Sequence, residues 1–319
     1  MSQVVPTVTF TGLAGTAALR YLVLIAAVSF PAVASDSPRP VVSLTGDTLR
    51  PVPLSTAVLE ERHTELSGAQ AVFDADPDDP DAIIWLGRRN AYLGRYHEAV
   101  DIFTRGIALH PDDARMFRHR GHRFITVRKF DDAIADLTWA AELTADREDT
   151  IEPDGLPNAL NIPTSTLQTN IWYHLGLARY LKGDFAGAAA AYAECVKRSK
   201  NNDMLVATLY WYYLSLRRLG HDDEATILLD PVHEEMKIIE NDSYFTLLLF
   251  FKEILREVEL TTAATDGLRN ATVQYGMASW LCFSGDKDRC DELMADIVQT
   301  PEWAAFGYIA AEADLCRSR

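Results

Sequence analysis

Residues 80–111, which read PDAIIWLGRRNAYLGRYHEAVDIFTRGIALHP, decide the fold. Residues 114–143 repeat the same pattern as ARMFRHRGHRFITVRKFDDAIADLTWAAEL. At an offset of 34 residues the corresponding pairs are Gly87 with Gly121, Tyr96 with Phe130, and Ala99 with Ala133. Self-similarity at a fixed period of this size predicts a repeat architecture in which each unit contacts its neighbours.

Each unit contains two helical patterns separated by a turn. Small and apolar residues recur at helical spacing on both sides of Gly94: Ile83, Leu86 and Gly87 before it, and Ala99, Phe103 and Gly106 after it. Small residues let two helices approach closely, and large aromatic side chains fill the remaining space. Because neither helix can bury its apolar stripe alone, the units are expected to stack.

The unit resembles the tetratricopeptide repeat (TPR) family, whose 34-residue repeat has small residues at positions 8, 20 and 27 and a proline near position 32. The residues that carry the resemblance are Gly87, Ala99, Gly106 and Pro111 in the first unit, Gly121, Ala133 and Ala140 in the second, and Gly176, Ala188 and Cys195 in the third. The resemblance implies an all-α, right-handed superhelical solenoid of helix-turn-helix repeats.

Weaker repeats and flanking segments complete the predicted organisation. Residues 209–229 read as a fourth repeat, residues 274–297 as a degenerate fifth, and Glu65 to Pro77 as the second helix of an incomplete first unit. Residues 231–260 carry two further helical stretches, and the helix from Trp303 to Leu315 is expected to cap the array. The predicted divisions are 1–34 (signal peptide), 35–54 (Pro-rich linker), 55–143 (half repeat and repeats 1–2), 144–169 (inserted loop), 170–230 (repeats 3–4) and 231–319 (further helices and cap).

The first 34 residues have the pattern of an export signal. Arg20 precedes an apolar run from Tyr21 to Phe30, and Ala32-Val-Ala34 follows, with small residues where a signal peptidase cuts. The run is short for a membrane-spanning helix. The alternative is a buried first helix. We expect an exported protein, periplasmic or secreted, from a bacterium.

The net charge limits the classes of partner that the chain can bind, and the cysteines bear on the compartment in which it works. The chain carries a net charge of −16, or 29 − 46 = −17 without residues 1–34, which argues against nucleic-acid binding and against an anionic membrane surface. Export permits disulfides. Cys282 and Cys290 lie on neighbouring predicted helices and could pair, Cys316 could compete for either, and Cys195 is expected to be packed and free.

An inserted segment separates the second and third repeats. Residues 144–169 keep no repeat register and include Glu152-Pro-Asp-Gly, a turn sequence. Ser165 to Gln168 then has capping-box spacing and restarts a helix. Irregular segments of this length are often functional. This one is either an inert surface loop or a cover over the repeat groove that shapes what enters it.

A basic stretch marks the predicted groove. Residues 82–130 contain ten basic and four acidic side chains, a balance of +6. In the TPR family the first helix of each repeat lines a concave face, which implies the partner-binding set Arg88, Tyr92, Arg115, Arg118, His122, Tyr173, Tyr180, Tyr210 and Arg217. Arginines and tyrosines suit a peptide with acidic and apolar residues. The alternative is that these arginines pair with acidic neighbours.

The function expected from these features is a non-enzymatic scaffold or adaptor that holds a protein or peptide partner and needs no cofactor. The alternatives are a metal-assisted hydrolase or a small-ligand-binding protein that uses the groove. His119 and His122 lie three residues apart on one helix and could share a metal, although no third ligand is evident nearby. No nucleophile-elbow, phosphate-loop or zinc-protease motif is present.

Overall fold

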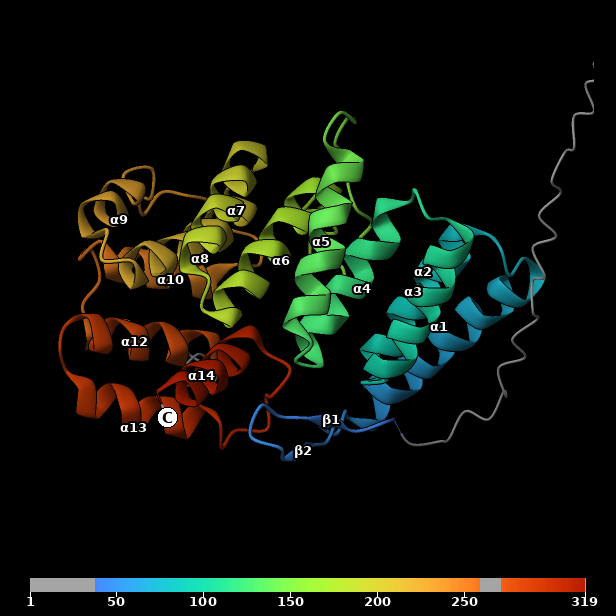
Figure 1. Cartoon of the computed structure of the whole chain (residues 1–319), viewed down its shortest axis with the longest axis horizontal. Coiled ribbons are helices and arrows are strands. Elements are labelled where there is room, and N and C mark those ends of the chain that lie inside the picture. Colours follow the sequence, from blue (N-terminus) through green and yellow to red (C-terminus); the bar gives the residue numbers. More distant parts are fainter. Residues whose placement is uncertain (1–37, 259–270, 319) are drawn as a thin grey trace, which may run out of the picture. The chain divides into compact units, whose positions relative to one another are not determined.

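The computed structural model describes residues 38–258 and 271–318, which form helices and one short hairpin (Figure 1). The predicted signal peptide, residues 1–34, lies outside the described residues. The strands are β1 (Val41–Val42) and β2 (Thr48–Leu49). The helices are α1 (Thr56–Ala75), α2 (Pro80–Tyr92), α3 (Tyr96–Leu109), α4 (Ala114–Thr126), α5 (Phe130–Thr144), α6 (Leu167–Lys182), α7 (Phe185–Arg198), α8 (Asn202–Arg218), α9 (Asp222–Leu228), α10 (Asp242–Phe251), α12 (Ala271–Phe283), α13 (Lys287–Ile297) and α14 (Phe306–Arg317).

Consecutive helices pair as the repeat pattern predicts, and α2 with α3, α4 with α5, and α6 with α7 form three successive pairs. In each pair a glycine of the first helix lies directly against a large side chain of the second: Gly87 on Phe103, Gly121 on Leu137, and Gly176 on Tyr192. A methyl group added at these glycines would come within 2.4–2.7 Å of that side chain. The predicted all-α solenoid of TPR-type helix pairs is therefore confirmed.

Helix starts follow local capping chemistry. The side chain of Asp79 accepts a hydrogen bond from the backbone N–H of Ala82, and Pro80 occupies the first helical position. The capping box before α6 lies one residue later than the sequence predicts, because Thr166 caps the helix and exchanges hydrogen bonds with Thr169.

The helix before the first complete repeat is longer than predicted. Instead of beginning at Glu65, α1 begins at Thr56, where Ser55 caps it by accepting from the N–H of Val58. No side chain of α1 is fully buried, although the helix packs against α2. The weak apolar periodicity of its first turns explains why the sequence pattern missed them.

The C-terminal helices pack against the repeats as well as against one another. α14 contacts α12, α13 and α6, and α10 contacts α8 and α12. Figure 1 shows α12, α13 and α14 along the lower side of α6 and α8. Of the two helical stretches predicted between residues 231 and 260, α10 is one, whereas residues 231–241 form turns and loops; residues 259 and 260 lie outside the described part of the chain.

A tyrosine network fastens these C-terminal helices to the repeats. Tyr180 of α6 and Tyr275 of α12 share a hydrogen bond of 2.8 Å between their hydroxyl groups, and the Tyr275 hydroxyl donates to Asp314 of α14 at 2.7 Å. Arg218 of α8 forms an ion pair with the same Asp314 carboxylate. Four helices from separate parts of the chain thus meet at one polar centre, in which each group has a partner.

The predicted linker turns back on itself as a hairpin, and it contacts both the first repeat and the segment before α14. β1 and β2 form a two-residue antiparallel ladder. Arg39 forms ion pairs with Glu98 and Asp101 of α3. The Trp303 indole N–H donates to the Arg50 carbonyl, so the linker joins the first repeat to the segment that leads into α14.

The cysteines are arranged as one disulfide and two free thiols. A disulfide joins Cys282 of α12 to Cys290 of α13. Cys195 is free and buried, and burial raises the pKa of its thiol to about 12. Cys316 is free and half-buried. Among the described residues, no helix is both long and apolar enough to cross a membrane.

Arg128 replaces glycine at the turn of the second repeat. The corresponding residues Gly94 and Gly183 have φ of 75° and 85°, and Arg128 has a φ of 64°. A left-handed backbone costs a residue with a side chain roughly 1–2 kcal/mol. Hydrogen bonds of the side chain offset this cost. The Arg128 guanidinium donates to Glu312 of α14 at 2.9 Å and to the Trp303 carbonyl at 2.8 Å. Arg128 therefore connects the repeats to the C-terminal helix.

We expect Arg128→Gly to lower the free energy of unfolding by roughly 2–4 kcal/mol, measured by urea denaturation. Loss of the buried guanidinium leaves the Glu312 carboxylate without its cation, which costs about 3–5 kcal/mol of stability. Glycine relieves the left-handed backbone at this position, which restores about 1 kcal/mol. Adding Glu312→Gln should recover part of the loss. An Arg128→Gly protein as stable as the parent would show that the ion pair contributes nothing net.

Candidate functional site

Four arginines gather where the first helices of repeats 1 and 2 face the inserted segment. We call Arg88 and Arg89 of α2 together with Arg118 and Arg123 of α4 the arginine cluster. Arg118 is buried, and the other three are half-buried. The cluster arises because α2 and α4 present residues at corresponding turns of successive repeats, which lie side by side in a stacked array.

The inserted segment, residues 144–169, covers this cluster with an acidic loop, Glu152–Gly155. The Glu152 carboxylate lies 3.0 Å from Arg118 Nε, and its side chain is only 9% exposed. Arg88 Nη1 donates to the Pro153 carbonyl at 2.7 Å, and Arg89 Nη1 donates to the Gly155 carbonyl at 2.9 Å. The loop thus lies on the arginines as an extended acidic peptide would.

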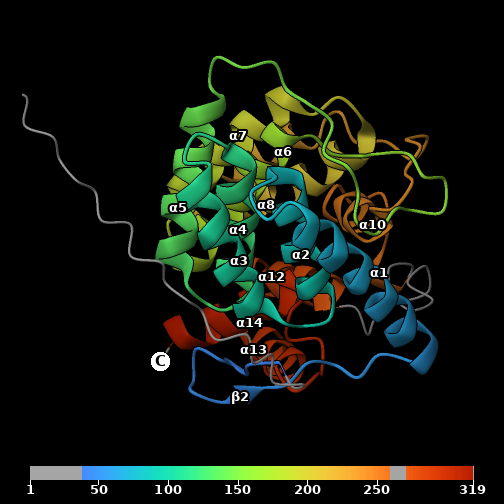
Figure 2. The same ribbon diagram turned by 90° about the vertical axis from the view of Figure 1, so that its right-hand side faces the viewer.

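The rest of the inserted segment is anchored on both sides. In Figure 2 it appears as the green loop that extends from the end of α5 toward α10. The hydroxyl of Thr164 donates to Glu240, just before α10, and the Asn201 side chain donates to the Thr164 carbonyl at 2.9 Å. Asn158 donates to the Ile162 carbonyl at 2.7 Å and closes a turn within the segment. The segment therefore has a defined conformation.

Three histidines lie beside the arginine cluster in their neutral form. His119 stacks on Phe103 with ring centroids 5.4 Å apart, and the rings of His122 and His174 are 4.2 Å apart. Burial first, and the nearby arginines second, hold the pKa of each imidazole well below its ordinary value. At neutral pH these histidines add no positive charge, so the arginines alone set the charge of the site.

Like Arg88, which donates to the Pro153 carbonyl and to the Tyr92 hydroxyl, Arg123 has no carboxylate partner among the described residues. Its guanidinium carbon lies 5.6 Å from the centre of the Tyr96 ring, in cation–π geometry. Burial lowers the pKa of the guanidinium to about 10, with Tyr96 and Tyr92 opposing that shift. A half-buried cation without a counter-charge favours an anion from outside the chain.

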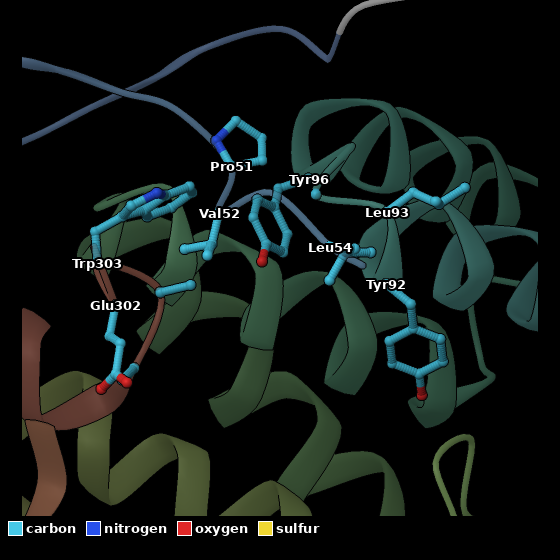
Figure 3. Close-up of a pocket in the computed structure, with 11 residues that line it drawn as sticks. Pro51, Val52, Leu54, Tyr92, Leu93, Tyr96, Glu302 and Trp303 are labelled. Atoms are coloured by element: carbon cyan, nitrogen blue, oxygen red, sulfur yellow. The ribbon is translucent and has the colours of Figure 1, made fainter. Parts of the chain in front are cut away.

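Next to the cluster, a cavity of about 530 Å³ opens between three separate segments (Figure 3). Its walls come from the linker at Val52 and Leu54, from the first repeat at Tyr92 and Tyr96, and from Trp303 before α14. In Figure 3 the hydroxyl groups of Tyr92 and Tyr96 point to the same side. The Tyr92 hydroxyl accepts a hydrogen bond of 3.3 Å from Arg88 Nε, so this cavity borders the arginine cluster.

The inserted segment also presents large apolar side chains to solvent. We call them the exposed apolar set: Ile151 (66% exposed), Leu156 (45%), Leu160 (63%) and Ile162 (48%). Leu160 also lines an open groove of about 810 Å³, whose other walls include Met236, Ile238 and Phe245. The same segment thus carries the acidic loop that contacts the arginines and apolar side chains that are exposed to solvent.

The structure brings three of the predicted partner-binding residues together and separates the others. Arg88, Tyr92 and Arg118 lie around the inserted segment and the cavity beside it, whereas His122 packs against His174 and Phe306. Arg115, at the edge of this region, is paired with Asp113 and Asp81, and Arg217 with Asp222.

The remaining three predicted residues are buried under the C-terminal helices. Tyr173 accepts from the Trp211 indole at 3.0 Å, Tyr180 bonds to Tyr275, and Tyr210 donates to the Thr272 carbonyl at 3.3 Å. In this structure their side chains are not on a surface that a partner can reach. The sequence pattern places them on the inner face of the repeats but does not reveal that α12 and α14 cover that face.

Sequence reasoning missed the acids that neutralise much of the basic stretch. Arg120 pairs with Asp136, Arg118 with Glu152 and Arg128 with Glu312. All three acids lie outside residues 82–130, so a local charge count does not include them. The sequence could have placed Arg123 at this site, because it lies one helical turn after His119 on the same helix. No spacing rule connects Glu152 to Arg118.

The histidine pair considered as a metal site is divided between two surroundings. His119 Nε2 lies 3.6 Å from Glu152, and His122 faces His174 and Phe306. Within residues 38–258 and 271–318, no group of three or more histidine, cysteine or acidic side chains is arranged to hold a metal.

Solved structures with similar folds include TPR proteins. MamA AMB-1 is similar at 21% identity with a TM-score of 0.41, over 56% of this chain and 90% of that one. YrrB, described as a TPR protein with an unusual peptide-binding site, is similar at 11% identity with a TM-score of 0.42, over 74% and 95%. No protein-family model and no curated protein matches the chain. Since these TM-scores are low, the TPR-type fold is assigned from the chain's own helix pairs.

Neutral burial of His119, His122 and His174 predicts that stability falls as the pH falls below the unfolded-state pKa of 6.5. Below that pH the unfolded chain binds protons that the folded chain does not bind. The free energy of unfolding therefore falls by about 1.4 kcal/mol per pH unit for each histidine. Urea denaturation between pH 7.5 and 5.5 measures this slope. His122→Gln should reduce the slope by about that amount, and His63→Gln on exposed α1 should leave it unchanged. Equal slopes for all three proteins would contradict the assignment.

Proposed function

We propose that this chain is an exported, non-enzymatic adaptor that binds a protein or peptide partner through exposed apolar side chains of its inserted segment. The observation that carries the proposal is the exposed apolar set. Large apolar side chains that are left in solvent beside an apolar groove indicate an interaction site. Four such side chains within twelve residues, each 45–66% exposed, set this segment apart from the repeats that flank it.

The anchoring of the segment supports the proposal. A binding surface that is already ordered loses little conformational entropy when a partner arrives, so more of the contact energy becomes affinity. The bonds from Asn158, Thr164 and Asn201 hold the backbone around Leu160 and Ile162 in place before any partner is bound. The groove beside Leu160, with Met236 and Phe245 in its wall, can receive an apolar side chain of the partner.

Export is part of this proposal and has two supports. The apolar run and Ala32-Val-Ala34 have the order of a cleaved signal. The disulfide between Cys282 and Cys290 fits an oxidising compartment, where such bonds persist. The partner would then be a protein or peptide of the periplasm or of the secreted fraction.

The test is site-specific photo-crosslinking in the source cell. A photoreactive amino acid placed at Leu160 should give a discrete crosslinked product with one partner protein. The same amino acid at Ile227 of α9, which is 64% exposed against 63% for Leu160, serves as the matched control and should give none. Because both side chains are exposed, neither replacement is expected to disturb the fold by more than about 0.5 kcal/mol.

Substitution of a neighbouring residue completes this test. With the photoreactive group kept at position 160, Ile162→Ser should lower the yield of the crosslinked product at least severalfold, because it removes a neighbouring apolar contact. Ile227→Ser should leave that yield unchanged. Equal products from positions 160 and 227, or none from position 160, would contradict the proposal.

A further inference from the structure

We propose that the arginine cluster is a second, latent site for an acidic peptide segment, and that the chain's own acidic loop keeps it closed. The inference rests on the proposed function in one respect: the partner that binds the exposed apolar set is the molecule expected to open it. The acidic loop and the exposed apolar set belong to the same inserted segment. A partner that moves this segment therefore changes access to the cluster.

The contacts of the acidic loop are those that a bound peptide would make. Glu152 is held through its carboxylate by Arg118 and by the Asn170 side chain, which donates at 3.1 Å. Pro153 and Gly155 are held through backbone carbonyls that any sequence possesses. One acidic side chain and two carbonyls are thus the features read by α2, α4 and α6. A segment of another protein with the same spacing can make the same contacts.

The loop leaves part of the site unused. Glu152 meets Arg118, whereas Arg123 has no carboxylate among the described residues. A partner segment with two acidic residues could pair with both arginines, and charge-assisted bonds of this kind are stronger than neutral ones. Such a segment would therefore make a contact that the internal loop cannot make. This difference favours exchange of the loop for a diacidic partner.

The acidic loop packs so closely on α2 that a methyl group added at Gly155 would clash with α2. A Cβ added at Gly155 would come within 2.0 Å of the Tyr92 hydroxyl oxygen and 2.7 Å of Arg88 Nη2. Gly155→Ala should therefore push the loop away from the cluster without changing any charge. Gly68→Ala on α1 is the matched control, because a Cβ there meets no atom within 4 Å.

The experiment uses fluorescence anisotropy with a labelled synthetic peptide that has the sequence of residues 149–158, DTIEPDGLPN. A second peptide carries glutamine in place of the glutamate. The full chain is used as wild type, Gly155→Ala, Glu152→Gln and Gly68→Ala, and circular dichroism verifies that each is folded. Hydrogen exchange of amides 150–158 reports independently whether the loop has been released.

We expect the acidic peptide to bind Gly155→Ala and Glu152→Gln at least tenfold more tightly than it binds wild type or Gly68→Ala. A site that is open for less than a tenth of the time loses at least that factor in apparent affinity. The glutamine peptide should bind each protein weakly. Adding Arg118→Ala to the Gly155→Ala chain should reverse the gain.

Two results would overturn the inference in different ways. Equal binding of the acidic peptide by wild type and Gly155→Ala, with faster exchange in the variant, would show that the loop does not close the cluster. No binding by any folded variant would show that the cluster is not a site for acidic peptides. Neither result bears on the crosslink at Leu160, so the proposed function can fail or stand by itself.

Discussion

The close approach of paired helices at Gly87, Gly121 and Gly176 is the contact on which the rest of the structure depends. Each glycine leaves room for Phe103, Leu137 or Tyr192 of the next helix to lie against the backbone. The close contact sets the geometry of each helix pair, and stacked pairs bring corresponding residues of α2, α4 and α6 to one face. The arginine cluster exists because this stacking brings α2 and α4 together.

That inner face is then largely covered by the chain itself. The hydroxyl groups of Tyr173, Tyr180 and Tyr210 form hydrogen bonds with α10 or α12 of the C-terminal helices, and Asp314 of α14 pairs with Arg218 of α8. Buried polar groups of this kind are costly unless each has a partner. The tyrosines therefore serve the attachment of the C-terminal helices, and the surface available to a partner shifts to the inserted segment and to the cavity beside Tyr92.

Charge is distributed by the tertiary structure in a way that gives the arginines different roles. Arg128 fastens the second repeat to α14, Arg120 is neutralised by Asp136, and Arg118 receives Glu152 from the inserted segment. Arg123 keeps an uncompensated charge against Tyr96. A basic stretch that looks uniform in sequence thus separates into structural ion pairs and arginines, Arg123 among them, that have no carboxylate partner among the described residues.

The sequence by itself determined the elements and their pairing. The 34-residue offset, the small residues at Gly87, Gly121 and Gly176, and the interruption at 144–169 are local or periodic features, and periodic packing follows from local spacing. It also indicated that Cys282 and Cys290 lie close enough in the fold to pair. The tertiary structure alone decided which groove residues remain accessible and which acid meets which arginine. Burial by α14 and the contact between Glu152 and Arg118 join residues far apart along the chain, and no periodicity encodes such contacts.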